Sequence, residues 1–406
     1  MKTVGIIGAG ASGMMAAISA KNHGAEVILI EHKDRVGKKI LSTGNGRCNF
    51  TNIDQSPKYY RSDTPEFPIS VLSQFSVPDT ISFFLKLGVY SKNRNGYLYP
   101  NSDQASSVLD VLRFEIDRLG IRVYTDTNVT DIQKTKKGFQ IHTHQKTYSC
   151  DSLILATGSK AAPVTGSDGS GYNLAKSFGH SLAPVLPALV QLKCKESFYK
   201  NLAGIRTQAK VILCINEEPI AEDIGELQLT KLGISGIPVF QISRFAARGL
   251  YEKQNVTAEL DFMPDFDDDA LTSFLNTRIQ SKPDKTLDTF FIGLFPAKLA
   301  NTWISLSKIS RDKKVSNLSE NEKLVLLNLI KHFHTEIIDT NGFESAQVCA
   351  GGVRGNELDA DTLESKLVDH LYFCGEIIDV DGICGGYNLQ WAWSSGYVAG
   401  REAATC

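Results

Sequence analysis

The first thirty residues of this chain contain the pattern that most constrains its fold. An apolar run at residues 4–7 leads into the turn Gly8-Ala9-Gly10-Ala11-Ser12-Gly13, then a helical stretch and a second apolar run that ends at Glu31. In such a unit Gly8 permits the turn, Gly10 lets the backbone approach a pyrophosphate, and Gly13 lets the helix pack on the sheet. The helix N-terminus offers unpaired N–H groups to the pyrophosphate, and Glu31 lies where it would accept ribose hydroxyls. The segment predicts a dinucleotide site without distinguishing NAD, NADP and FAD; the alternative is a purely structural turn.

Length and charge narrow the class of protein. A chain of 406 residues should form two or three domains, and a net charge of −2 with mixed signs leaves no basic face for nucleic acid or an anionic membrane. The eight cysteines are scattered without a CxxC pair, so we expect reduced thiols and no metal site. Glycines interrupt the apolar N-terminus, which argues against a signal peptide, and no apolar run is long enough to span a bilayer. We expect a cytoplasmic protein with neither a membrane nor a nucleic-acid partner, and the sequence leaves its oligomeric state open.

A basic and then glycine- and amide-rich segment follows Glu31. Residues 42–52 contain few apolar side chains, so burial in a core would not order them. Their backbone amides, together with Asn45, Arg47 and Asn49, suit a polar, anionic or heteroaromatic ligand. The alternative is a solvated surface loop.

Helical and strand-like patterns then alternate as far as a second motif at residues 152–158. Apolar periodicity predicts helices over residues 69–87 and 104–119, and strands at 97–100, 121–124, 129–132, 139–144 and 147–150. The next apolar strand ends in Ala156-Thr157-Gly158, which in two-dinucleotide-fold flavoproteins passes beside the cofactor. The glycine-rich stretch 166–172 lacks a preceding apolar strand. We therefore interpret it as a turn that caps a helix at 173–178, and not as a second nucleotide loop.

The middle of the chain has a different pattern. Short strand candidates, separated by polar or glycine turns, predict a β-barrel or sandwich; they lie at residues 189–193, 209–215, 226–230 and 256–262. Helical periodicity dominates residues 267–333, with a helix start at Ser319-Glu320-Asn321-Glu322. This segment predicts a small helical subdomain.

The tail holds the motif that selects among nucleotides. An apolar strand at residues 371–374 ends in Gly375-Glu376, Asp379 follows, and Gly385-Gly386 opens a final helix. In two-dinucleotide-fold flavoproteins the corresponding acid contacts ribityl or pyrophosphate groups, and the last helix points its N-terminus at the isoalloxazine. That helix dipole favours negative charge on the reduced flavin. Because a simple NAD dehydrogenase has no use for such a site, the tail indicates FAD.

Four segments together resemble the BaiN/YhiN-like family of FAD-dependent oxidoreductases, which are two-dinucleotide-fold flavoproteins. They are Gly8 to Gly13; Gly44-Asn45-Gly46-Arg47-Cys48-Asn49 with Thr51-Asn52; Gly351-Gly352-Val353 with Glu357; and the tail from Gly375 to Ala392. The match spans nearly the whole chain. It implies an α/β fold with a discontinuous Rossmann-like FAD-binding domain over residues 1–188 and 340–406, an inserted β-barrel domain over 189–265 and a small helical domain over 266–339.

The resemblance also implies roles for individual residues. The ADP half of FAD would be held by Gly8, Gly10, Ala11, Ser12, Gly13, Glu31 and His32, with Val129, Ala156, Thr157 and Gly158 near the adenine side. The flavin would lie along Lys39, Gly44, Asn45, Gly46, Arg47 and Cys48. Gly375, Glu376, Asp379, Gly386, Asn388 and Leu389 would close over pyrophosphate, ribityl and ring. The chain departs from the family pattern at Ile237. Family members tend to place proline directly after Ser-Gly, whereas here Ile237 stands between Gly236 and Pro238. The substrate of a characterised relative is therefore not assigned to this chain.

Hydride transfer at flavin N5 is the chemistry that this assignment implies. Arg47 would stabilise developing negative charge. Tyr387 or Cys48 would transfer a proton. The alternative for Cys48 is a purely structural role as a small packing residue. Only one dinucleotide loop is convincing, so NADH or NADPH would act as a transient electron donor. The expected substrate is a small molecule such as an enone or steroid-like compound. Alternatives are a flavin-dependent amine oxidase, an RNA-modifying flavoprotein, an FAD-stabilised binding or sensor protein, and a plain NAD dehydrogenase.

Overall fold

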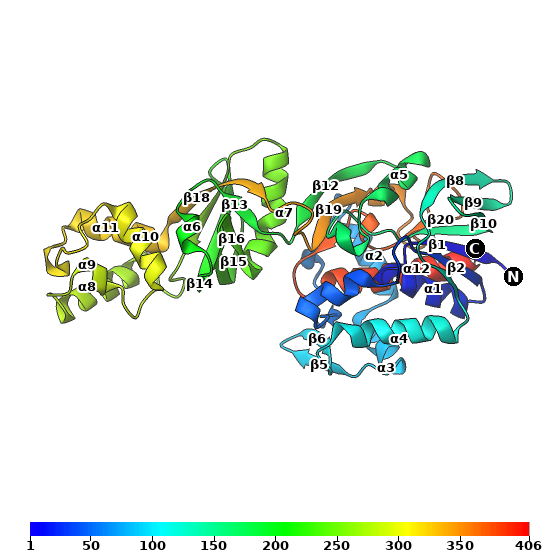
Figure 1. Cartoon of the computed structure of the whole chain (residues 1–406), viewed down its shortest axis with the longest axis horizontal. Helices are drawn as coiled ribbons and strands as arrows, with labels where there is room; N and C mark the ends of the chain where they lie inside the picture. Colours follow the sequence, from blue (N-terminus) through cyan, green and yellow to red (C-terminus); the bar gives the residue numbers. More distant parts are fainter. Residues whose placement is uncertain (406) are drawn as a thin grey trace. The chain divides into compact units, whose positions relative to one another are not determined.

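The computed structural model describes residues 1–405 and divides them into two compact units (Figure 1). Unit 1 joins the two ends of the chain, Met1–Leu186 and the segment from Gln347 onward, and unit 2 is Pro187–Ala346. Each unit has its own hydrophobic core. No helix in residues 1–405 is long and apolar enough to cross a bilayer.

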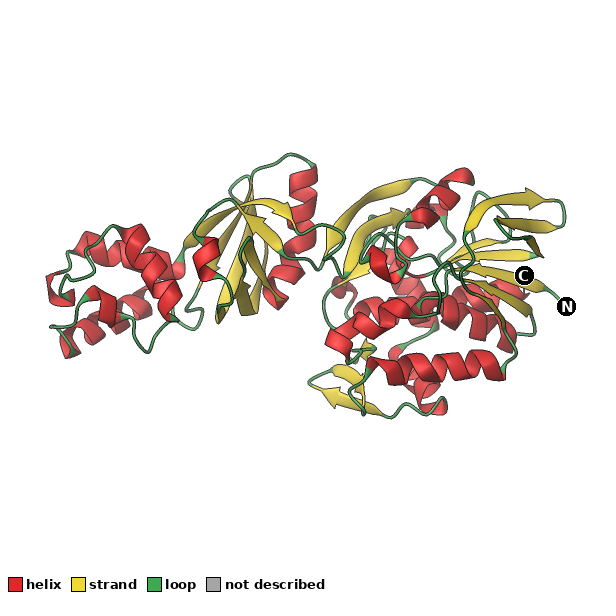
Figure 2. Cartoon of the chain, in the orientation of Figure 1, coloured by secondary structure: helices red, strands yellow, loops and turns green. Residues whose placement is uncertain are grey.

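A five-stranded parallel sheet forms the centre of unit 1 (Figure 2). Its strand order is β20-β11-β1-β2-β7, and every neighbouring pair is parallel. The strands are β1 (Thr3–Ile7), β2 (Glu26–Ile30), β7 (Arg122–Tyr124), β11 (Ser152–Leu155) and β20 (Leu371–Phe373). Parallel strands covered on both faces require apolar side chains on both faces, which explains the nearly unbroken apolar runs in the sequence. This sheet confirms the Rossmann-like α/β class.

The first and last helices of the chain pack directly against each other beside this sheet. Helix α1 (Ala11–Asn22) and helix α12 (Tyr387–Thr405) approach so closely that a Cβ on Gly396 would lie 2.4 Å from the Ser12 carbonyl oxygen. At Gly400 the corresponding distance to the Ala16 carbonyl oxygen is 2.3 Å. The Ser19 hydroxyl also donates to the Tyr397 carbonyl at 2.8 Å. This contact brings the tail motif beside the glycine turn.

Smaller elements surround the sheet in unit 1. The helices are α2 (Glu66–Gln74), α3 (Val77–Lys86), α4 (Ala105–Arg118) and α5 (Ser170–Ser177). The remaining strands are β3 (Thr51–Asn52), β4 (Tyr60–Arg61), β5 (Ser91–Arg94), β6 (Tyr97–Pro100), β8 (Val129–Thr135), β9 (Gly138–Thr143), β10 (Thr147–Cys150), β12 (Leu182–Ala188), β19 (Val348–Val353) and β21 (Asp381–Gly382).

The prediction of a single helix over residues 69–87 is wrong, because the segment forms two helices, α2 and α3. Ser76 adopts extended backbone and caps α3 through a capping box, in which its N–H donates to Asp79 Oδ2 at 2.8 Å. A capping box starts a new helix, and Pro78 in the first turn prevents continuation from α2.

Unit 2 contains a closed six-stranded barrel, so the predicted alternative of a sandwich is excluded. The order is β13-β16-β15-β14-β17-β18, with β13 (Leu192–Cys194), β14 (Arg206–Ile215), β15 (Glu218–Leu229), β16 (Gly233–Gly236), β17 (Val256–Asp261) and β18 (Phe333–Thr340). Helix α7 (Ile237–Tyr251) follows β16, and α6 is Tyr199–Leu202. The expected domain bounds put residues 333–339 in the helical segment and residue 340 in the FAD-binding domain, but β18 closes the barrel by pairing with β13 and β17.

Four helices between β17 and β18 form the helical part of unit 2. They are α8 (Asp268–Ser281), α9 (Leu287–Phe290), α10 (Ala297–Ser307) and α11 (Glu320–Lys331). The predicted start of the last helix is confirmed, because Ser319 and Glu322 form a capping box. A buried ion pair, Lys331 Nζ to Asp261 Oδ2 at 2.6 Å, ties this helix to the barrel strand β17.

Candidate functional site

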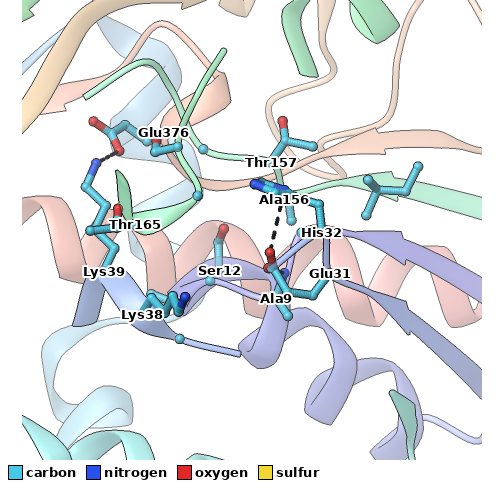
Figure 3. Close-up of a pocket in the computed structure, with 18 of the residues that line it drawn as sticks. Ala9, Ser12, Glu31, His32, Lys38, Lys39, Ala156, Thr157, Thr165 and Glu376 are labelled. Atoms are coloured by element: carbon cyan, nitrogen blue, oxygen red, sulfur yellow. Dashed lines mark hydrogen bonds and ion pairs between the residues drawn. The ribbon is translucent and has the colours of Figure 1, made fainter. Parts of the chain in front are cut away.

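A cavity of about 370 Å³ lies at the carboxyl end of β1, entirely within unit 1 (Figure 3). In parallel α/β sheets this edge is where ligands bind. The walls come from the glycine turn, the end of β2, the 3₁₀ segment η1 (Lys38–Gly46), the start of β8, the segment after β11, the loop before α5, the start of β19, and the first turns of α12. Both ends of the chain therefore contribute to one cavity.

The three glycines of the turn are required for different reasons. Gly8 has φ +98°, and a Cβ there would lie 2.4 Å from the Ala156 carbonyl oxygen; on Gly13 a Cβ would lie 1.9 Å from the Gly8 carbonyl oxygen. Gly10 differs, because its φ of −79° suits any residue and a Cβ would meet nothing within 4 Å. The protein's own packing therefore explains Gly8 and Gly13. The open side of Gly10, at the N-terminus of α1, fits a ligand phosphate held close to the backbone.

The carboxylate of Glu31 is fixed at the end of β2. Its Oε2 accepts the Ala9 N–H at 2.9 Å and its Oε1 accepts the Lys33 N–H at 2.9 Å. Each carboxylate oxygen has a second lone pair, so the anchored group can still accept a ligand hydroxyl. The neighbouring His32 lines the same part of the cavity, with Nδ1 3.6 Å from Glu31 Oε1 and a buried Nε2 that makes no hydrogen bond within residues 1–405.

A second carboxylate, Glu376, is held by groups from two distant segments. Its Oε2 accepts from Lys39 Nζ at 2.7 Å and its Oε1 accepts the Cys349 N–H at 2.9 Å. Figure 3 shows Lys39 and Glu376 directed toward each other beside the cavity. The pair joins η1 to the segment that follows β20.

The remaining polar lining fits an anionic dinucleotide. Arg35, Lys38 and Lys39 line the cavity, against two lining carboxylates, Glu31 and Glu376. The Thr157 hydroxyl is buried and has no hydrogen-bond partner within the described residues. A buried hydroxyl without a partner is uncommon in native proteins and is explained when a ligand supplies the bond. The basic side chains, the unpartnered Thr157 hydroxyl and the open backbone at Gly10 therefore fit FAD.

Most of the predicted cofactor residues line this single cavity. They are Gly8, Gly10, Ala11, Ser12, Glu31, His32, Lys39, Val129, Ala156, Thr157, Gly158, Glu376, Asn388 and Leu389. Because they come from seven separate stretches of sequence, their convergence is a property of the fold and not of any one motif.

Four other predicted residues lie behind the wall of the cavity, where they shape its lining. Gly13 packs on Gly8. A Cβ on Gly375 would lie 2.3 Å from the Ser12 hydroxyl, and one on Gly386 would lie 2.7 Å from the carbonyl carbon of Thr51. Asp379 is buried and accepts the Asp63 N–H at 2.9 Å.

Residues 44–48, which the resemblance places along the flavin, do not line the cavity. In this segment of the chain, Thr43 is the last lining residue. Gly44, Asn45, Gly46 and Arg47 are exposed, and the first three adopt left-handed backbone. Cys48 is fully buried, and burial raises the pKa of its thiol to about 12. No part of the Cys48 side chain is accessible, so the structure favours the packing role for this residue.

Tyr387, the third catalytic candidate, belongs to a group of tyrosines at the start of α12. Its ring centroid lies 5.1 Å from that of Tyr59 and 5.7 Å from that of Tyr60. A Cβ on Gly385 would lie 2.7 Å from the ring of Tyr97. Burial, with smaller contributions from Asp54, Tyr59 and Tyr97, raises the pKa of Tyr387, so its hydroxyl keeps its proton at neutral pH.

The model of one protein family, described as the HI0933-like protein Rossmann domain, matches residues 2–402. The chain belongs to this family. It is an FAD-dependent oxidoreductase.

Three relatives of known name match over almost their whole length. The 3-dehydro-bile acid delta(4,6)-reductase of Clostridium scindens is 48% identical over 100% of this chain and 99% of its own. Ribosomal RNA dihydrouridine synthases of Haemophilus influenzae and Escherichia coli are each 32% identical, over 97% and 98% of this chain and 96% of their own.

Several residues that line the cavity are not indicated by any motif in the sequence. Thr165, Gly166, Ser167, Ser170 and Asn173 come from the loop and first turn of α5. Helix α5 begins at Ser170, three residues before the predicted start, and Gly169 is its N-cap. The glycine-rich stretch 166–172 therefore includes the first turn of the helix, and it also forms one wall of the cavity. Nothing local distinguishes a capping turn from a cavity wall. Lys38 could have been found, because it lies in the basic run that the analysis singled out.

Proposed function

We propose that this chain reduces carbon–carbon double bonds conjugated to a carbonyl group in a small apolar, steroid-like substrate, with NADH or NADPH as the electron donor. The observation that carries the proposal is the 48% identity, over the full length of both chains, to a relative named as a bile acid reductase. The enzyme class and the FAD requirement follow from the family; the substrate class and the nicotinamide donor are the proposal.

The two kinds of named relative have one chemical step in common. A delta(4,6)-reductase of a 3-dehydro compound saturates double bonds conjugated to a ketone, and dihydrouridine arises by saturation of the uracil double bond conjugated to a carbonyl. At the double bond adjacent to the carbonyl, a hydride adds to the carbon β to the carbonyl and a proton adds to the α carbon. In this chain the two electrons would come from the nicotinamide through bound FAD. This shared step favours a conjugated double bond over an amine as the substrate.

FAD, when bound, supplies hydride transfer at N5. The chain's own part is to bind and orient it. We assign the phosphates to the N–H groups at the start of α1 beside Gly10, the adenosine ribose to Glu31, and the adenine side to Val129 and Thr157. We assign the flavin half to Lys39, Glu376, Asn388 and Leu389.

The proton for the α carbon must come from the protein or from water. Of the three candidates, we assign this role to Tyr387, whose hydroxyl is protonated at neutral pH and which opens the helix carrying Asn388 and Leu389. Arg47, an exposed and permanently charged guanidinium on the loop before Cys48, would stabilise negative charge on the carbonyl oxygen.

The proposal is tested by product analysis. The purified holoprotein is incubated anaerobically with NADH or NADPH and a 3-oxo-4-ene steroid, and the products are separated by mass spectrometry. We expect a product that has gained two hydrogens, in a reaction that requires both the nicotinamide and the FAD-loaded protein. Reducible FAD without any reduced steroid would overturn the substrate assignment.

Reduction of uridine in ribosomal RNA is the second candidate, favoured by the two relatives at 32% identity. The same assay with protein-free ribosomal RNA in place of the steroid distinguishes the two. Dihydrouridine formation there, with no steroid product, would select this candidate.

A further inference from the structure

We infer that the helical part of unit 2 binds a small, uncharged apolar molecule in a second cavity. This cavity has a volume of about 240 Å³ and lies among α8, α9 and α11, which Figure 1 shows together in yellow and yellow-green. None of its lining residues lines the dinucleotide cavity. It is therefore a site with its own ligand.

The lining is mainly apolar. Leu275 and Ile279 come from α8, Phe290 and Phe291 from the end of α9, and Leu327 from α11. Leu275 and Leu327 are each 8% exposed and Phe291 is 1% exposed, so the side chains form an enclosed floor and not an outer face. Burial of a ligand against them removes apolar surface from water on both sides.

The cavity opens to solvent beside Leu324, and its floor is apolar. An engineered apolar cavity of about 150 Å³ takes up benzene. An apolar ligand on this floor would likewise displace water from apolar surface.

The charged groups at the cavity define the ligand's charge. Glu320 and Lys323 lie at its edge and pair with each other, Lys323 Nζ to Glu320 Oε1 at 2.8 Å. The Glu320 side chain is 86% exposed and points to solvent. With its two charges paired, the lining offers no partner for a charged ligand. Thr272 and Asn276 of α8 add polar atoms that suit a single hydroxyl or carbonyl on the ligand.

The volume sets the ligand's size. The volume exceeds that of the benzene-sized cavity, so one or two fused rings fit in it. Leu324, 54% exposed at the rim, marks the side from which a ligand would enter.

The test uses N-phenyl-1-naphthylamine, an uncharged apolar dye that fluoresces when it leaves water, with the FAD-loaded full-length protein. We expect one saturable site in the unmodified protein. Asn276→Phe places a ring in the cavity and should weaken dye binding at least tenfold. Ser273→Phe adds the same ring at an exposed position of α8 outside the lining and should bind as the unmodified protein does.

Thr272→Phe fills the cavity from a second position. It keeps the inference testable if Asn276→Phe fails to fold. Naphthalene should raise the melting temperature of the unmodified protein and of Ser273→Phe, but not that of either filled variant. Absence of saturable dye binding, or equal binding by Thr272→Phe and Ser273→Phe, would overturn the inference.

Discussion

Lys39 Nζ lies 2.7 Å from Glu376 Oε2, although 337 residues separate the two in the sequence. Both side chains line the cavity, and the other oxygen of Glu376 accepts the Cys349 N–H at 2.9 Å. The contact links the first βαβ unit to the tail, which are joined in space but separated in sequence by all of unit 2. The cavity that we propose for FAD is therefore formed by both ends of the sequence.

Removal of either partner should weaken FAD binding by leaving the other charge unpaired beside the cavity. The side chains are 26% and 18% exposed, between a surface pair and a buried one, so we expect a coupling of about 1 kcal/mol in a double-mutant cycle. Lys39→Met also leaves an unpaired anion beside the site proposed for FAD, and should raise the dissociation constant about tenfold, or ~1.4 kcal/mol. Flavin titration of the apoprotein measures this for Lys39→Met, Glu376→Gln and the double variant. Strictly additive effects would show that the pair does not act as a unit.

Gly10→Ala should lose FAD without losing the fold. The backbone at Gly10 suits alanine, and a Cβ there meets no protein atom within 4 Å. The free energy of unfolding of the apoprotein should therefore differ from that of the unmodified apoprotein by no more than about 0.5 kcal/mol. A bound phosphate would meet that Cβ, so we expect at least tenfold weaker FAD binding by titration. Gly13→Ala is the contrast, because its Cβ would lie 1.9 Å from the Gly8 carbonyl oxygen and should destabilise the fold itself. Unchanged FAD affinity in Gly10→Ala would place the phosphates elsewhere.

Tyr387→Phe should lower kcat and leave FAD content unchanged. A positioned general acid contributes roughly 10²–10⁴-fold, and phenylalanine keeps the ring contacts with Tyr59 and Tyr60 while removing the proton. The matched control is Tyr60→Phe, whose lost hydroxyl bonds to Gln55 Oε1 at 2.6 Å, and which should change kcat only slightly. Steady-state kinetics with the steroid enone provide the measurement. An unaltered kcat in Tyr387→Phe would assign the proton to water or to another group.

His332 should make unit 2 more stable at mildly acidic pH than at alkaline pH. Its Nδ1 lies 3.0 Å from Glu259 Oε1 and its Nε2 lies 3.2 Å from Asp268 Oδ2. Burial lowers the pKa of His332, but the hydrogen bonds to Glu259 and Asp268 and their charges raise it by more, so the net direction is upward. Because the folded state holds the proton more tightly, the stabilisation is complete below the unfolded pKa of about 6.5 and is lost as pH rises through the folded pKa.

The measurement is the melting temperature of the unmodified protein minus that of His332→Gln, across the range from acidic to alkaline pH. We expect this difference to be largest at acidic pH and to shrink as the pH rises. Asp268→Asn, which removes one of the two partners, should reduce the pH dependence. A difference that grows toward alkaline pH would contradict the assignment.

Local patterns in the sequence were sufficient for the central sheet and for the ligand-binding turn. Apolar runs such as residues 152–155 form the strands of the parallel sheet, and Gly8 and Gly13 have the roles that their spacing predicts. The start of α11 follows from its capping box. These features depend on interactions between residues close in sequence, which periodicity and capping chemistry describe.

Contacts between distant residues were not predictable in the same way. No local pattern indicates that Lys39 meets Glu376, or that the loop before α5 forms a wall of the cavity. Strand β18 shows alternating burial from Phe333 onward, yet it follows a helix directly, and the preceding helical periodicity concealed the change. The break between α2 and α3 was visible in Ser76 and Asp79 but was outweighed by the apolar spacing on either side.

The most direct test of the account is an anaerobic half-reaction followed by flavin absorbance. The purified holoprotein is first reduced with NADH or NADPH, excess nicotinamide is removed, and one equivalent of a 3-oxo-4-ene steroid is added. The account predicts that the nicotinamide bleaches the visible flavin band and that the steroid restores it in proportion to the amount added. A flavin that neither nicotinamide reduces, or a reduced flavin that the steroid leaves bleached while air restores it, would contradict the account.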